Sequence, residues 1–252
     1  MCTVCGCGEG DLRIENAPHR HDDPARLIKL EQDILAKNDR YAAENRRVLE
    51  SRGILAFNVM SSPGAGKTSL LVETIRAFEG RRACAVIEGD QQTSADADRI
   101  RAAGAQAVQI NTGKGCHLDG HMVGHALDRL APAPDSILFI ENVGNLVCPA
   151  AFDLGEARKV VIFSVTEGED KPLKYPDIFA VANLVVMSKV DLLPHLAFDM
   201  DTAVANARKI NPDVAVLRTS ASSGAGMDDW IQWIEAARAD LSMVPVPSRA
   251  AG

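Results

Sequence analysis

The chain of 252 residues is long enough for one α/β domain and an appendage. Its formal net charge of −7 disfavours binding to nucleic acid or to an anionic membrane, and no apolar run reaches membrane-spanning length. The first ten residues lack the apolar core of a signal peptide, so we expect a cytoplasmic protein without nucleic-acid or membrane partners. Six cysteines in such a chain favour metal or redox chemistry over structural disulfides.

Residues 1–24 read as a metal-binding tail and linker. Cys2, Cys5 and Cys7 lie among glycines, whose flexible backbone lets the three sulfurs converge on one ion. Thiolates are the ligands that soft metals select, and the N-terminal amine is close enough to be a fourth ligand. A thioredoxin-type redox pair would need a βαβ context, and half of a structural zinc site would need a second cysteine pair. His19 and His21 stay open between solvated linker residues and ligands.

Helical spacing of apolar residues over residues 25–52 predicts a long helix that packs on the main domain, with Leu30 and Val48 in its apolar stripe. Residues 53–243 alternate strand and helix patterns, and residues 244–252 are expected to form a disordered tail. The alternation predicts an α/β fold, a mostly parallel sheet with helices on both faces. The expected strands cover residues 54–60, 83–88, 106–110, 136–141, 159–165, 183–187 and 214–219.

The first strand leads into Ser-Ser-Pro-Gly-Ala-Gly-Lys-Thr at 61–68, followed by a helical pattern. Strand, glycine-bearing loop, Gly-Lys-Thr and helix are the context of a P-loop, in which backbone amides and a helix N-terminus hold phosphate. Ser61 replaces the first glycine of the general pattern, and an ordinary strand-to-helix turn is the weaker alternative. Lys67 would reach the β- and γ-phosphates, and the Thr68 hydroxyl would bind Mg²⁺. We expect nucleotide contacts from Pro63, Gly64, Ala65, Gly66, Lys67, Thr68 and Ser69.

Two carboxylates follow strands at the same expected edge of the sheet. Asp90 stands where it could hold Mg²⁺ directly or through water, although a helix N-cap is an equal alternative. Glu141 closes an apolar strand three residues before Gly144, which is typical of a switch segment that senses the γ-phosphate. A buried carboxylate there would be costly without a cation. We therefore expect Lys67, Asp90 and Glu141 to be catalytic, with Mg²⁺ held by Thr68, Asp90 and Glu141.

A base-reading loop is predicted at Ser-Lys-Val-Asp, residues 188–191. The Asp191 carboxylate would accept hydrogen bonds from guanine N1–H and its amine, which adenine does not offer as a pair, and the Lys189 stem would pack over the ring. Ser188 replaces the usual asparagine, whose amide braces this loop, so we expect weaker affinity rather than changed specificity. Ser220 and Ala221 lie in a later segment that resembles the last base-contacting loop of GTPases.

A second metal site is predicted beside the switch segment. Cys116 and His117 follow the third strand, and Cys148 follows Gly144, which together give two thiolates and an imidazole. For each cysteine alone a buried apolar role is the better interpretation. Cys84, inside a strand, is expected to belong to the core. His121 and His125 are expected to be surface residues.

Together these segments, with Thr-Glu-Gly-Glu-Asp-Lys-Pro-Leu-Lys-Tyr-Pro at 166–176, resemble the HypB family of SIMIBI-class P-loop GTPases, which help to insert nickel into [NiFe]-hydrogenase. The resemblance implies hydrolysis of GTP with Mg²⁺ and a homodimer linked to nucleotide or metal. It also implies a tight nickel site at Cys2, Cys5 and Cys7. A weaker Ni²⁺ or Zn²⁺ site would lie at Cys116, His117 and Cys148. The partners it implies are a HypA-type metallochaperone and the precursor of the hydrogenase large subunit.

Two other functions fit parts of the same pattern. One is a GTPase that serves another nickel enzyme such as urease, against which the cysteine-bearing start of the chain argues. The other is a metal-storage protein whose nucleotide site only regulates metal binding. Turnover of GTP with and without nickel would separate these functions.

Overall fold

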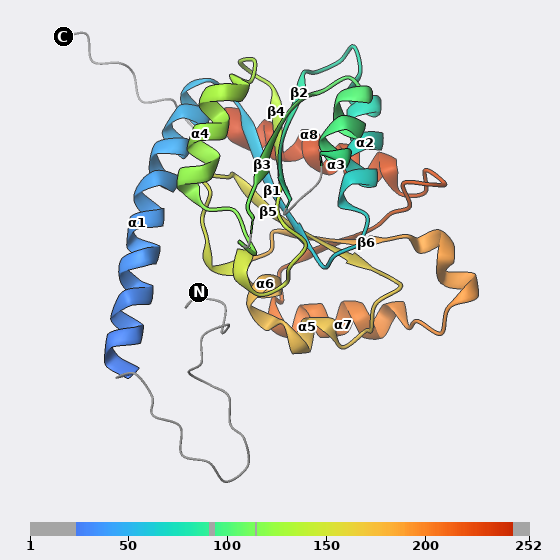
Figure 1. Cartoon of the computed structure of the whole chain (residues 1–252). Coiled ribbons are helices and arrows are strands. Elements are labelled where there is room, and N and C mark those ends of the chain that lie inside the picture. The colour runs from blue at the N-terminus through green and yellow to red at the C-terminus, as the bar shows by residue number, and fades with distance from the viewer. Residues whose placement is uncertain (1–23, 91–93, 114, 244–252) are drawn as a thin grey trace, which may run out of the picture.

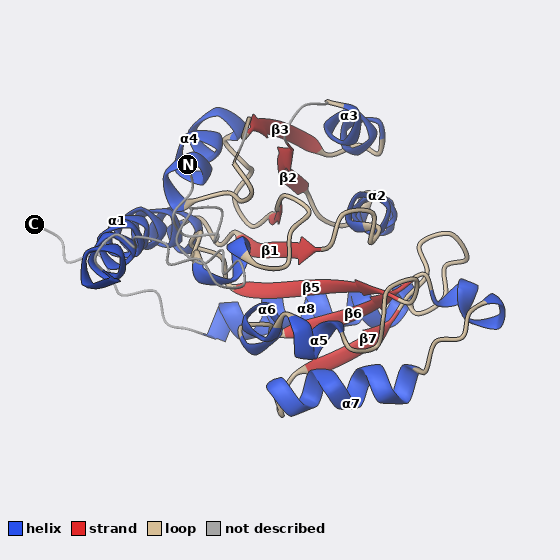
Figure 2. Ribbon diagram, turned by 60° about the horizontal axis from the view of Figure 1, so that its bottom comes forward, coloured by secondary structure: helices blue, strands red, loops and turns tan. Residues whose placement is uncertain are grey.

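The computed structural model describes residues 24–90, 94–113 and 115–243, and in this part of the chain seven strands form one parallel sheet. The sheet order is β3-β2-β4-β1-β5-β6-β7, and Figure 2 shows the strands labelled there (β3, β2, β1, β5, β6 and β7) in this order. The predicted α/β sheet is thereby confirmed. The strands are β1 (Leu55–Ser61), β2 (Cys84–Asp90), β3 (Gln106–Asn111), β4 (Ile137–Glu141), β5 (Arg158–Ser164), β6 (Leu184–Ser188) and β7 (Ala215–Arg218).

Helices connect the strands and cover both faces of the sheet (Figure 1). The α-helices are α1 (Pro24–Ser51), α2 (Lys67–Phe78), α3 (Ala95–Ala102), α4 (Gly120–Leu130), α5 (Lys171–Lys174), α6 (Pro176–Ala180), α7 (Met200–Ile210) and α8 (Met227–Met243). Two short 3-10 helices are η1 (Cys148–Ala151) and η2 (Val190–His195).

Alternation of side chains along the strands divides the core between the two faces. Phe57 and Val59 of β1 pack in the cluster that includes buried residues of α2, α3 and α8. Ala56 and Met60 point the other way, toward clusters formed with α1 and α4 and with α6 and α7. Because parallel strands present all their carboxyl ends at one edge, the loops after β1, β2, β3, β4 and β6 converge there.

Helix α1 lies along α4 and extends beyond it (Figure 1), so its packing on the domain is confirmed, but its buried stripe differs from the predicted one. Leu30 is 45% and Val48 is 46% exposed, whereas Asn38 and Asn45 are each 5% exposed. Gly120 at the start of α4 permits the close contact, since a Cβ there would lie 2.9 Å from the Ala42 nitrogen. Leu49 is buried and Ile34 and Leu35 pack on the core, so this part of the apolar pattern is confirmed. The pattern was wrong at Leu30 and Val48, because backbone groups of the domain take polar partners from the helix instead.

Several predicted features lie outside the described residues. They are the expected ligands Cys2, Cys5 and Cys7, the histidines His19 and His21, and the tail at 244–252.

Candidate nucleotide and metal site

The loop between β1 and α2 has the backbone geometry of an anion-binding turn. Gly66, the N-cap of α2, adopts φ 98° and ψ 24°, a left-handed conformation that favours glycine. Gly64 also has a positive φ of 73°. Gly144 of the switch segment packs against this loop, where an added Cβ would lie 2.9 Å from the Pro63 Cα. The loop is therefore held in place by the segment that follows Glu141.

Lys67, the first residue of α2, is buried and has an acceptor within the loop. Its Nζ donates to the Ser61 Oγ at 3.0 Å, and the side chain of Ser61 is fully buried. Burial lowers the pKa of Lys67, although the charge of Glu141 opposes this effect. The serine that replaces the first glycine of the general pattern thus serves as the resting partner of the lysine.

Thr68 and Glu141 form a direct contact in front of the lysine. The Thr68 Oγ1 donates to the Glu141 Oε1 at 2.8 Å, while the Glu141 Oε2 is buried and finds no partner among the described residues. Burial raises the pKa of Glu141 to about 7. A hydroxyl beside an unpartnered buried carboxylate oxygen is a donor set that fits a hard divalent cation such as Mg²⁺.

Asp90 ends β2 on the same face of the sheet as Glu141, as the pairing of Glu88 with Glu141 and strand alternation require. The N-cap of α3 is Ser94, so the alternative role of Asp90 as the cap of that helix is wrong. Glu88 lies one pleat deeper, a carboxylate that the sequence analysis did not single out. Burial, followed by the charge of Glu141, raises its pKa to about 8. Its signal in the sequence is a charged residue inside an apolar strand.

The loop after β6 sits against the P-loop. The Ser188 Oγ donates to the Ala65 carbonyl at 2.7 Å, and the Lys189 Nζ donates to the Gly64 carbonyl at 2.7 Å. Lys189 has a left-handed backbone with φ 60°. The shorter Ser188 hydroxyl thus also reaches a carbonyl of the P-loop, while the weaker nucleotide affinity expected from the missing amide stays a prediction.

The Asp191 carboxylate is oriented by two serines of the loop after β7. The Ser220 Oγ donates to Oδ1 at 2.6 Å and the Ser222 Oγ to Oδ2 at 3.1 Å. The hydrogen bond from Ser220 lowers the pKa of Asp191, so it is ionised at neutral pH. Two loops that are distant in the sequence thus present one exposed carboxylate that can accept a pair of hydrogen bonds.

Cys116, His117 and Cys148 come together in space, with one potential ligand atom of each within 4.8 Å of the others. The two sulfurs are 2.9 Å apart, and the Cys116 Sγ lies 3.5 Å from the His117 Nδ1. The His117 ring packs against the Phe152 ring at a centroid distance of 4.0 Å. Burial lowers the pKa of His117, which favours the neutral, metal-binding form. Two thiols and a neutral imidazole can bind Ni²⁺ or Zn²⁺ and leave a further position open.

Asparagine side chains of the switch segment connect it to the backbone around this cluster. Asn145 donates from Nδ2 to the Cys116 carbonyl at 3.2 Å and accepts the Val147 N–H at 2.8 Å. Nearer the strand, Asn142 accepts the Leu118 N–H at 3.1 Å. The loop after β3 and the loop after β4 are thereby joined at Cys116 and at Leu118.

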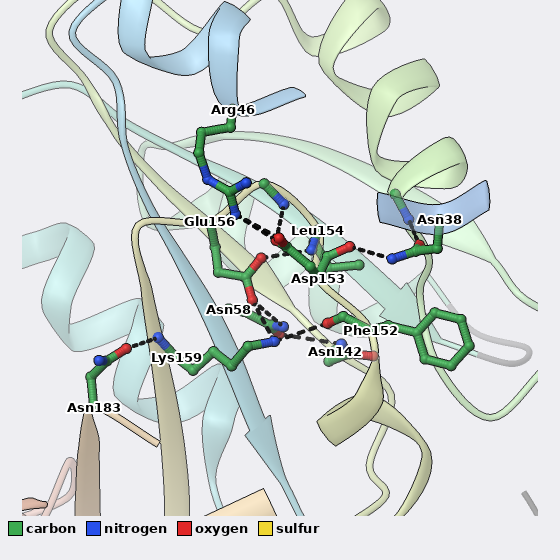
Figure 3. Close-up of polar contacts among 12 residues, drawn as sticks. Asn38, Arg46, Asn58, Asn142, Phe152, Asp153, Leu154, Glu156, Lys159 and Asn183 are labelled. Atoms are coloured by element: carbon green, nitrogen blue, oxygen red, sulfur yellow. Dashed lines mark hydrogen bonds and ion pairs between the residues drawn. The ribbon is translucent and has the colours of Figure 1, made fainter. Parts of the chain in front are cut away.

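A polar network attaches α1 to the β4–β5 connection (Figure 3). Asn38 donates to the Asp153 carbonyl, and Arg46 donates to both oxygens of the Asp153 carboxylate at 2.7 Å. Asn45 donates to the Gly120 and Leu154 carbonyls. Sequence reasoning missed these residues. The signal in the sequence is the seven-residue spacing of Asn38 and Asn45 within one helix.

The remaining candidates have structural surroundings. Cys84 is half-buried beside the core, and burial raises the pKa of its thiol to about 11, so it is protonated at neutral pH. His121 and His125 are exposed on α4, as predicted, with their Nε2 atoms 3.0 Å apart. Within the described ranges, no helix has both the length and the apolar character needed to cross a membrane.

Comparisons with known proteins identify the family of the chain. Residues 55–218 match the model of the CobW/HypB/UreG nucleotide-binding domain. The chain is 55% identical to the hydrogenase maturation factor HypB of Azotobacter vinelandii, over 94% of this chain and 93% of that protein. Crystal structures of HypB from Archaeoglobus fulgidus (41% identity, TM-score 0.75) and of HypB from Helicobacter pylori in complex with nickel (38%, 0.76) each match 81% of this chain. The match covers 99% of the Archaeoglobus fulgidus chain and 96% of the Helicobacter pylori chain. The chain therefore belongs to the HypB family of hydrogenase maturation factors.

Proposed function

We propose that the chain is a GTP-hydrolysing nickel metallochaperone that delivers nickel during maturation of [NiFe]-hydrogenase. The observation that carries this proposal is the attachment of the cluster of Cys116, His117 and Cys148 to the segment that begins at Glu141. That segment also contacts the P-loop through Gly144. Family membership and the nickel complex of the Helicobacter pylori relative support nickel as the cargo.

Specificity for guanine rests on Asp191. Its ionised carboxylate is oriented by Ser220 and Ser222, and both of its oxygens remain able to accept more than one hydrogen bond. Guanine presents two adjacent donors, whereas adenine presents one donor beside an acceptor. Lys189 is held over the P-loop, where its stem can pack on a base. We therefore assign base recognition to Lys189, Asp191, Ser220 and Ala221.

Phosphate binding and hydrolysis rest on the P-loop and the carboxylates behind it. Residues 63–69 would hold the phosphates through backbone amides, and Lys67 would leave Ser61 to neutralise phosphate charge. Thr68, Asp90 and Glu141 would hold Mg²⁺, which would supply charge stabilisation for phosphoryl transfer. Glu141 already contacts Thr68, so loss of this contact on nucleotide binding would move the switch segment.

The cysteine cluster would respond to the same movement. Cys148 lies in η1, after the switch segment, while Cys116 and His117 lie on the loop after β3. Metal–ligand distances tolerate changes of only about 0.2 Å. A shift of η1 relative to the β3 loop would therefore change metal affinity, so that GTP and GDP forms differ. By linkage, metal would shift nucleotide affinity by the same factor.

We further propose a homodimer that brings two such clusters together and contacts with a HypA-type metallochaperone and the hydrogenase precursor. Val147 supports this view, since it is apolar, 50% exposed and adjacent to Cys148. The tight nickel site would be the three-thiolate site at Cys2, Cys5 and Cys7, for which tetragonal geometry suits Ni²⁺ better than Zn²⁺.

The test has two arms. Purified protein should hydrolyse GTP but not ATP, and deletion of residues 1–7 should remove tight nickel binding while turnover of GTP stays nearly unchanged. In cells lacking the gene, the wild-type chain should restore hydrogenase activity at low nickel concentrations, whereas the variant Cys148→Ala should restore less. Hydrolysis of ATP and GTP at equal efficiency, or full hydrogenase activity without the gene, would refute the proposal.

A further inference from the structure

Glu88 stands beside Glu141 in a dry part of the sheet. The two residues are register partners in the neighbouring strands β2 and β4, so their side chains leave the same face about 5 Å apart. Glu88 is 2% and Glu141 is 3% exposed. The Oε2 atom of each is buried and has no hydrogen-bond partner within the described residues. Two neighbouring buried carboxylates therefore each have one oxygen that accepts no hydrogen bond from the described residues.

The local cation does not satisfy them. The charge of Lys67 acts on both carboxylates, yet its Nζ donates to the Ser61 Oγ rather than to either of them. An unpartnered buried acceptor is costly, and two like charges side by side add to that cost. The fold itself gives no reason for a glutamate at position 88, because Val86 on the same face of β2 packs in the apolar core.

Another buried glutamate of this chain shows how the fold satisfies such a residue. Glu156 is 6% exposed, yet it accepts from the Asn58 Nδ2 and the Leu154 N–H and pairs with Lys159 at 2.8 Å (Figure 3). Both of its oxygens have partners within the protein. Glu88 thus differs from a structural glutamate by lacking the donor that its surroundings should supply.

We propose that Glu88 is a positioning carboxylate of the magnesium site, where its free oxygen accepts a hydrogen bond from a metal-bound water. Mg²⁺ is small, demands octahedral geometry and keeps several waters, each of which needs an acceptor. Asp90 lies one pleat nearer the edge and Glu141 lies alongside, so Glu88 closes the inner side of the site. This role rests on the proposed GTPase function and extends it to a carboxylate two residues before the proposed Mg²⁺ ligand Asp90.

The experiment measures Mg²⁺ affinity rather than turnover. Release of a fluorescent GDP analogue from the full chain would be followed over a series of Mg²⁺ concentrations and in excess EDTA. We expect Glu88→Gln, which keeps the shape but loses the charge, to weaken Mg²⁺ binding about 10- to 100-fold. GDP affinity in EDTA should be equal or tighter, because a neutral amide of the same shape adds no negative charge near the phosphates. Glu88→Leu should weaken Mg²⁺ binding to a similar extent. Because leucine has no amide, this second variant excludes an effect of new amide hydrogen bonds.

Glu156→Gln is the matched control, since it also neutralises a buried glutamate but lies away from the phosphates. It should lower the unfolding temperature and leave Mg²⁺ affinity within about twofold of the wild type. Mg²⁺ affinity of Glu88→Gln within the same twofold limit would overturn the inference and leave the GTPase proposal standing. Failure of the wild-type chain to bind GDP with or without Mg²⁺ would instead refute the proposed function, and this inference with it.

Discussion

Ser188→Ala tests whether the loop after β6 braces the P-loop. The Ser188 Oγ is the donor to the Ala65 carbonyl at 2.7 Å, and Ser188 and Ala65 are 5% and 1% exposed. Removing the hydroxyl leaves a buried carbonyl without this donor, a loss of about 1–2 kcal/mol. For a chain of this size that lowers the unfolding temperature by roughly 2–8 °C. If nucleotide binding must also re-order the loop, GDP affinity falls by up to about 30-fold.

Ser136→Ala provides a matched control. Ser136 is 1% exposed, and its Oγ has no partner within the described residues, so the same deletion removes an unsatisfied group and should be neutral or stabilising. Thermal unfolding by circular dichroism and GDP titration by calorimetry would be run on both variants and the wild type. Equal unfolding temperatures and equal GDP affinities for the two variants would show that the brace contributes nothing.

Three further predictions follow from the same geometry. Asp191→Asn should weaken GTP binding and admit xanthosine triphosphate, whose carbonyl can accept from the new amide; competition titrations would detect this, and equal affinity of the wild type for ATP and GTP would contradict it. In protein lacking residues 1–7, metal affinity should differ between the form bound to GDP and the form bound to a non-hydrolysable GTP analogue, and Cys148→Ala should abolish this difference. Identical metal affinities of the two forms without the substitution would mean that the cysteine cluster and the switch segment are independent. Burial raises the pKa of Asp153, but hydrogen bonds from Arg46 and Gly155 outweigh it, so the net pKa lies below its ordinary value. Such a carboxylate contributes stability above a pH of about 4, and this stability is lost as pH falls through the folded pKa. The unfolding temperature of Asp153→Asn should therefore fall less than that of the wild type between neutral and acidic pH. An equal fall in the two proteins would contradict this prediction.

Much of the architecture could be predicted because its causes are local. Each strand is a short apolar run, and each is separated from the next by a crossover long enough to hold a helix, so the sheet had to be parallel. Parallel strands then gather the residues after β1, β2, β3, β4 and β6 at one edge. This is why Thr68 and Glu141, or Cys116 and Cys148, could be grouped from positions far apart in the chain.

What the tertiary structure alone decided are the contacts that depend on unsatisfied groups of another segment. Asn45, rather than Val48, faces the domain because the Gly120 and Leu154 carbonyls need donors, and no pattern within α1 records that need. Ser188 reaches the Ala65 carbonyl only because the β6 loop lies against the P-loop. Glu88 reads as part of an apolar strand until the pairing of β2 with β4 sets it beside Glu141. Sequence periodicity indicates which face of a helix or strand is buried. It does not indicate which buried polar groups of other segments need a hydrogen-bond partner from that face.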